Sequence, residues 1–176
     1  EAAGKNYKPV ATYPEGHFGQ MLRTVMQMLV ADLGTQIYYV SLGGFDTHAQ
    51  QANLHANLLG QLSDGLRAFQ QDLAGCKLLD RVAVLTFSEF GRRVAENGSL
   101  GTDHGAASQL FLLRPAGAKT GKSGLIGRHP SLSDLDDGDL KHAVDFRSVY
   151  ATMLENWLDI PATGVLGKAY PKLDLI

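Results

Sequence analysis

Apolar residues recur with two different spacings along this chain, and the order of those spacings limits the possible folds. Residues 15–33 and 49–74 carry apolar side chains at intervals of three and four, which predicts two amphipathic helices. Between them, residues 35–42 are rich in β-branched and aromatic side chains, which predicts a buried strand. Helices that alternate with short buried strands are typical of a mainly parallel sheet covered on both faces.

The second half of the chain continues this alternation. Residues 81–87 and 107–113 are short apolar runs that predict two more strands, with a polar loop between them. Residues 115–140 are rich in glycine, proline and aspartate and are expected to be mostly loop. Residues 145–158 predict a last helix, with Asp145 as its N-cap. We therefore expect residues 1–176 to form a single α/β domain with a mainly parallel sheet covered by helices on both faces.

Composition and charge exclude several classes of protein. With 44% hydrophobic and 19% charged residues, the chain can bury a core and does not resemble a disordered protein. A formal net charge of -2 provides no electrostatic footprint for nucleic acid. The longest apolar stretch, residues 21–33, is interrupted by Arg23, Gln27 and Asp32, so no membrane span is expected. Cys76 is the only cysteine, which excludes an intramolecular disulfide and a multi-cysteine zinc site.

Polar residues that could carry chemistry follow the predicted strands. In open α/β sheets, ligands gather at the carboxyl ends of the strands, so residues from separate strands can converge there. The three groups are Asp46 with His48, Glu89 with Arg92, and Asp103 with His104.

Carboxylates and neutral imidazoles together suit a divalent metal ion. Asp46, His48, Glu89, Asp103 and His104 supply three carboxylates and two imidazoles, enough for one site or most of two. This ligand set permits zinc, manganese, magnesium or calcium.

Other roles for the same residues are also consistent with the sequence. Arg92 could bind an anionic substrate group through two parallel hydrogen bonds. Asp46 or Thr47 could instead cap the helix that begins near Ala49. Glu89 could be a surface carboxylate in a loop. Both interpretations stay open at this point.

Three motifs in this order resemble a known family: "GGFDTHAQQ", "VAVLTFSEFGRRVAENGSLGTDHGAA" and "DFRSVYATMLENWLDI". The chain resembles the C-terminal part of the bacterial domain-of-unknown-function family 1501, from about Phe18 to its end. The resemblance implies the alkaline phosphatase and sulfatase superfamily, an α/β/α sandwich and a bimetal centre.

Under this resemblance, Asp46, His48, Glu89 and His104 would bind metal, and Asp103 would be a further ligand or would orient His104. The superfamily has Asp-His where this chain has Ser88-Glu89-Phe90, so the division of ligands between two metals stays open.

The resemblance also places the family's nucleophile region before residue 1, and none of the residues of this chain is assigned as the nucleophile. Residue 1 is Glu and the start is polar, so we expect a preceding segment. The expected function is metal-dependent hydrolysis of a small phosphate or sulfate ester, in the periplasm or outside the cell. The missing N-terminal half or a second copy of the chain are the expected partners. The alternative is a non-catalytic binding or assembly module.

Overall fold

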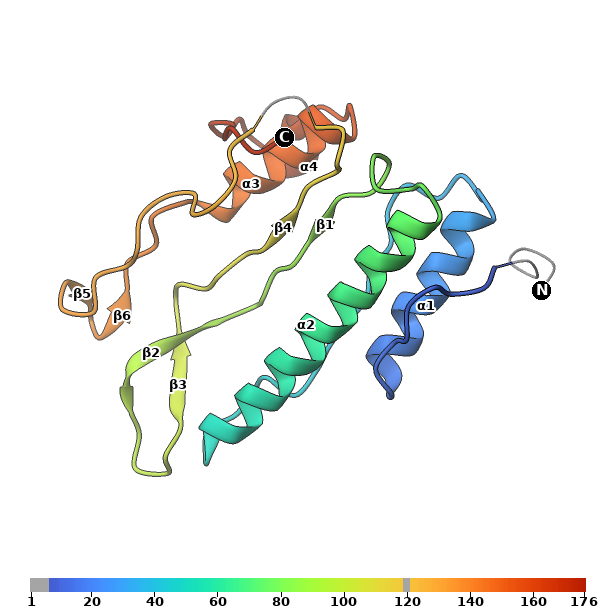
Figure 1. The fold of residues 1–176 in the computed structure, drawn as a ribbon. Coiled ribbons are helices and arrows are strands. Elements are labelled where there is room, and N and C mark those ends of the chain that lie inside the picture. The colour runs from blue at the N-terminus through green and yellow to red at the C-terminus, as the bar shows by residue number, and fades with distance from the viewer. Residues whose placement is uncertain (1–6, 119–120) are drawn as a thin grey trace. The chain divides into compact units, whose positions relative to one another are not determined.

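The chain forms two compact units in this computed structural model, which describes residues 7–118 and 121–176. The first unit comprises the described residues of Glu1–Val82 together with Asn97–Gly101, and the second comprises the described residues of Ala83–Glu96 and Thr102–Ile176 (Figure 1). Lys119 and Thr120, in the predicted loop, lie outside the described residues. The single domain expected from the sequence stays a prediction.

Two helices build the first unit, and both confirm the helical spacing. Helix α1 (His17–Val30) and helix α2 (Gln51–Gly75) run side by side in Figure 1, and an extended segment leads back from the end of α1 to the start of α2. Their facing side chains form the core because burying each large apolar side chain contributes about 1.5–3 kcal/mol. The buried core residues are Leu22, Val25 and Met26 of α1, with Ala68, Phe69 and Leu73 of α2.

A glycine allows the two helices to approach closely. A Cβ added at Gly65 of α2 would lie 2.6 Å from Cε1 of Phe18, whereas one at Gly60 would meet nothing within 4 Å. Gly65 weakens the helix intrinsically, as the sequence indicates, but its missing side chain provides the space that Phe18 occupies.

The predicted mainly parallel sheet is wrong. Every strand pair in the part of the chain that the structure describes belongs to a two-stranded antiparallel sheet. Residues 35–42 form no strand, and Ile37 and Tyr39 on this segment are 65% and 74% exposed. Without a parallel sheet for helices to cover, the three-layer α/β/α sandwich expected from the alkaline phosphatase resemblance is also wrong.

The predicted strand at residues 35–42 is absent because an extended segment becomes a strand only when it forms hydrogen bonds with a neighbouring strand. β-branched and aromatic composition favours an extended backbone, but pairing depends on tertiary context. Of the predicted strands at residues 81–87 and 107–113, only β1 (Val84–Leu85) and β4 (Leu112–Leu113) form, and they pair with each other in antiparallel orientation.

Two hairpins lie where the sequence predicts loops. Strands β2 (Gly91–Glu96) and β3 (Thr102–Gly105) pair around residues 97–101. Strands β5 (Leu135–Asp136) and β6 (Asp139–Leu140) pair around Asp137 and Gly138, whose φ angles are 47° and 83°. Two consecutive positive φ angles at Asp-Gly are typical of a type I′ turn, so this hairpin had a local signal in the sequence.

The predicted helix at the end of the second unit is confirmed, with a change of geometry. Helix α3 (Phe146–Thr152) begins after Asp145, whose carboxylate accepts a hydrogen bond of 2.9 Å from the backbone N–H of Arg147. A π-helical turn, η1 (Met153–Trp157), continues it, and the short helix α4 (Ala162–Leu166) follows beyond the predicted last helix. None of the described helices is both long enough and apolar enough to cross a membrane.

Candidate functional site

Asp46 and His48 meet on the segment that precedes α2. The Oδ1 atom of Asp46 lies 2.9 Å from Nε2 of His48, and the two side chains are 67% and 49% exposed. A carboxylate oxygen and an imidazole nitrogen at this separation are two ligand atoms of the kind that divalent ions prefer. The structure therefore brings together the first two residues that the sequence predicts as metal ligands.

The residue between them explains why both side chains point outward. Thr47 is buried, and its hydroxyl accepts a hydrogen bond of 3.1 Å from Nε2 of Gln51 on α2. Its backbone N–H donates to the carbonyl of Phe45 at 2.9 Å. This hydrogen bond closes a tight turn, and within that turn Thr47 is buried whereas Asp46 and His48 on either side of it are exposed.

A glycine two residues before Asp46 shapes the same turn. Gly44 has a φ of 95°, a backbone conformation that residues other than glycine rarely adopt. A Cβ atom added there would also lie 3.3 Å from Cδ2 of Leu58 on α2. The glycine therefore lets the backbone turn close to the side of α2.

The loop of residues 97–101 supports His48 from within the first unit. The side-chain amide of Asn97 donates a hydrogen bond of 3.0 Å to the backbone carbonyl of His48. A Cβ added at Gly101 would lie 2.4 Å from that same carbonyl oxygen, so the loop and the turn are in close contact. Asn97 also accepts hydrogen bonds through Oδ1 from the backbone N–H groups of Ser99 and Gly101, at 2.9 and 3.2 Å, which fixes the loop's shape.

The same loop also caps α2. The backbone N–H groups of Gln50 and Gln51 donate to the carbonyls of Ser99 and Leu100, at 3.0 and 2.9 Å. The N-cap residue is Gln50, in a left-handed conformation. The alternative prediction, that Asp46 or Thr47 is the N-cap of this helix, is therefore wrong, because the N-cap is Gln50. The sequence predicts a polar loop in this part of the chain, but it does not predict the contact of that loop with His48.

Arg92 and His104 face each other across the β2–β3 hairpin in the second unit. They are paired in the antiparallel register, and Nη1 of Arg92 donates a hydrogen bond to the backbone carbonyl of Thr102. The imidazole of His104 stacks on the ring of Phe90, with centroids 3.8 Å apart and an interplanar angle of 8°. The guanidinium carbon of Arg92 lies 5.2 Å from the same ring centroid. Phe90 therefore contacts two predicted site residues, a role that sequence reasoning missed.

Glu89 and Asp103 are the two remaining residues that the sequence predicts as metal ligands. Glu89 is exposed at a bend after β1, and its carboxylate makes no hydrogen bond or ion pair with any described residue. Asp103 precedes His104 on β3, and adjacent residues of a strand point to opposite faces. Neither carboxylate belongs to a group of three or more candidate ligands in residues 7–118 and 121–176.

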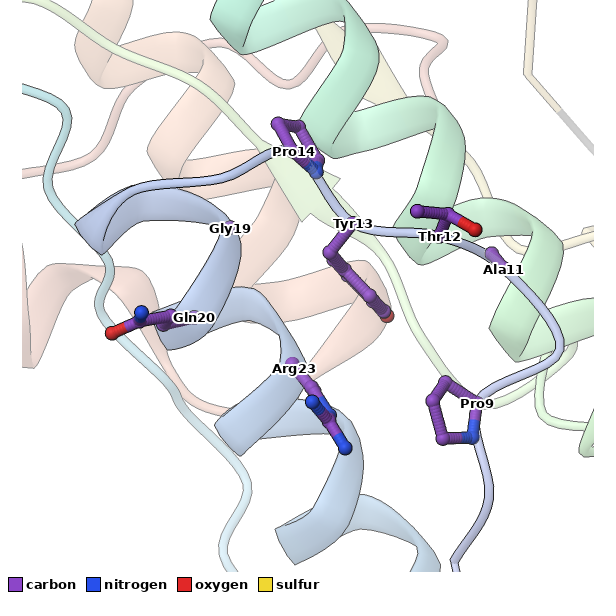
Figure 2. A pocket seen from close by; sticks show the side chains of 8 residues that line it. All are labelled: Pro9, Ala11, Thr12, Tyr13, Pro14, Gly19, Gln20 and Arg23. Carbon is purple, nitrogen blue, oxygen red and sulfur yellow. The ribbon is translucent and has the colours of Figure 1, made fainter.

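A surface pocket of about 440 Å³ lies between the N-terminal segment and α1, and it contains none of the predicted site residues (Figure 2). The buried carboxylate of Asp72 holds the N-terminal segment. It accepts hydrogen bonds of 2.7 and 3.1 Å from the backbone N–H groups of Val10 and Ala11, and a third hydrogen bond from the hydroxyl of Tyr7. Burial, followed by the hydrogen bond to Asp72, raises the pKa of Tyr7, so its hydroxyl stays a donor. Asp72 of α2 therefore holds in place the N-terminal segment that lines one side of the pocket.

Comparison with known proteins gives one result. No curated protein and no solved structure matches the chain. The model of the family described as "Protein of unknown function (DUF1501)" matches residues 1–160. The family resemblance found in the motifs is thereby confirmed, and the chain belongs to the DUF1501 family.

Proposed function

We propose that the chain binds a divalent metal ion through Asp46, His48 and His104 and uses it to hydrolyse a phosphate or sulfate ester. The observation that carries the proposal is the Asp46–His48 pair, with its two ligand atoms 2.9 Å apart on an exposed turn. An exposed pair is accessible to both an ion and a substrate. Zinc, manganese, magnesium and calcium all fit a mixed set of oxygen and nitrogen ligands.

Chain connectivity supports His104 as the third ligand. Gly101 lies against the backbone of His48, and His104 follows three residues further along the chain. Three residues span at most about 11 Å, so His104 starts within reach of an ion held at the turn. Asp103 projects to the other face of the strand, and we leave it out of this ion's ligands. Glu89 stays a predicted ligand with no contact that supports it.

The chemistry of the remaining residues fits an anionic ester. A bound divalent ion would polarise an ester oxygen and lower the pKa of a bound water. Arg92, on the strand opposite His104, carries a planar guanidinium group, the side chain best suited to binding phosphate or sulfate oxygens through paired hydrogen bonds. No residue of this chain is proposed as a nucleophile, and placement in the periplasm or outside the cell is part of the proposal.

Calorimetric titration of the metal-free protein with each of the four ions tests metal binding. We expect saturable binding of at least one ion, and we expect the double variant D46A/H48A to lose it. The matched control is His129→Ala, because His129 is an exposed histidine outside the predicted site. No binding by the wild-type protein, or equal binding by the double variant, would contradict the proposal.

An assay on generic aryl phosphate and aryl sulfate esters tests the reaction. The metal-loaded protein should release phenol faster than the metal-free protein, and R92A should raise KM more than it lowers kcat, because Arg92 is assigned to substrate binding. Metal binding without any turnover would remove the hydrolase part and leave a metal-binding protein.

The second candidate is a non-catalytic binding or assembly module. The observation that favours it is the extended segment of residues 35–42, on which Ile37 and Tyr39 are 65% and 74% exposed. This candidate predicts no metal binding, together with concentration-dependent association in sedimentation experiments. Replacement of both side chains by serine should abolish that association.

A further inference from the structure

We propose that Phe90 is a positioning residue that orients His104 and Arg92 for the metal and the substrate. This inference rests on the proposed function, because it assigns Phe90 to a site that includes His104. Its basis is one aromatic ring that contacts both side chains, with the imidazole centroid at 3.8 Å and the guanidinium carbon at 5.2 Å.

The stack fixes the plane of the imidazole. The lone pair of an imidazole nitrogen lies in the plane of the ring, so the orientation of that plane determines the direction from which an ion can bind. With an interplanar angle of 8°, Phe90 covers one face of the His104 ring and not its edge, where the nitrogen lone pair lies. Rotation of the imidazole about its Cβ–Cγ bond would drive the ring edge into Phe90. Metal-ligating histidines are commonly oriented by a partner group, and here an aromatic face would serve in place of a hydrogen bond.

Two glycines hold the stack in place. Gly91 follows Phe90 and is paired in register with Gly105, which follows His104. A Cβ at Gly91 would lie 1.6 Å from the carbonyl oxygen of Ala107, and one at Gly105 would lie 2.6 Å from the carbonyl carbon of Arg92. The hairpin can close this tightly only with glycine at both positions, and the close backbone approach brings the two rings together. The parallel geometry is therefore set by the hairpin, since free aromatic pairs prefer offset or edge-to-face arrangements.

Arg92 contacts the same Phe90 ring and is also held by a hydrogen bond to Thr102. Its Nη1 donates to the carbonyl of Thr102 while its guanidinium carbon lies over the Phe90 ring. Arginine commonly stacks on aromatic faces, which leaves its N–H groups directed sideways toward an anion. Loss of the Phe90 ring should therefore affect both metal affinity and the KM for an anionic ester.

The experiment compares Phe90→Leu with Phe90→Tyr. Leucine keeps an apolar side chain but has no flat face, whereas tyrosine keeps the ring. The matched control is Phe87→Leu, because Phe87 is on the same segment, is half-exposed, and packs edge-on against Tyr150 at 6.4 Å. Metal affinity is measured by titration with the ion that the wild-type protein binds, alongside the midpoint of thermal unfolding. The proton resonances of the His104 ring are recorded in metal-free protein, because a stacked ring shifts them upfield.

We expect F90L to weaken metal binding about 10-fold, at the lower end of the range for groups that orient ligands. F90L should also remove the upfield shift of the His104 ring protons. F90Y and F87L should bind metal as the wild-type protein does. If F90L lowers the unfolding midpoint more than F87L does, F90Y decides the matter: restored binding supports positioning by the ring, and unrestored binding overturns it.

His104→Ala separates this inference from the proposed function. If H104A weakens metal binding and F90L does not, the positioning role is wrong and the ligand role of His104 stands. If H104A leaves metal binding unchanged, the proposed ligand role fails, and the role of Phe90 fails with it.

Discussion

The chain contains two Asp/His pairs, and local backbone geometry gives them different capacities. Asp46 and His48 are separated by one residue, and their side chains meet at 2.9 Å. Asp103 and His104 are adjacent on strand β3, where neighbouring side chains point to opposite faces. The first pair can therefore act on one ion, whereas the second can offer only one of its members to any single site on that strand.

The difference shows that spacing has meaning only relative to the backbone on which it lies. On β3, an interval of one residue separates the two groups, whereas at the turn an interval of two leaves both groups exposed on either side of a buried residue. The same two residue types thus lie in contact in one place and are directed to opposite faces in the other. The buried residue between the first pair, Thr47, sets which face is exposed.

Deleting Thr47 should have the largest effect, because it gives Asp46 and His48 the spacing of the second pair. We expect metal affinity to fall by more than about 100-fold, beyond the range for residues that only orient ligands. The matched control is Thr47→Ala, which removes the hydrogen bond from Gln51 but keeps the spacing; it should cost about 1 kcal/mol of stability. Titration calorimetry and urea unfolding measure the two quantities. Equal affinities in the deletion and the control would show that spacing is not the cause.

The support behind His48 can be removed without touching either ligand. Gly101→Ala would place a methyl group 2.4 Å from the backbone of His48, so the loop must shift; overpacking of this kind costs about 1–3 kcal/mol. Metal affinity should also fall, because the shifted loop no longer supports the backbone of His48. Gly98→Ala, in the same loop, is the control, because a Cβ there meets nothing within 4 Å. Unfolding midpoints and metal titrations of both variants check this. Indistinguishable variants would argue against a supporting role for the loop.

The helices were predictable because their signals are local. The apolar spacing of α1 and α2 and the Asp145 cap of α3 are each contained in a few neighbouring residues. The sheet was not predictable in the same way. The apolar composition of residues 35–42 indicates an extended backbone, but it carries no information about a partner strand, and the expected parallel sheet was wrong.

The candidate site was predictable in its chemistry more than in its geometry. Asp46 and His48 were identified because of their residue types and their position after an apolar run. The support from Asn97 and Gly101 depends on contacts between residues 49 or more positions apart, which no local pattern encodes. Phe90 was overlooked because an aromatic residue beside a polar motif is ordinarily assigned to the core, and its stack with His104 arises from the β2–β3 register.

The smallest expected effect is at Asp103, and it tests the comparison most directly. Asp103→Asn keeps the size of the side chain and removes its charge, as Asp46→Asn does at the first pair. If alternation along β3 directs Asp103 away from the ion that His104 binds, Asp103→Asn should change metal affinity by no more than about 0.5 kcal/mol, the usual range for an exposed substitution. Asp46→Asn should weaken binding far more, because it removes a charged ligand. Equal losses in the two variants, measured by the same titration, would mean that both carboxylates serve the ion and that the strand geometry does not separate them.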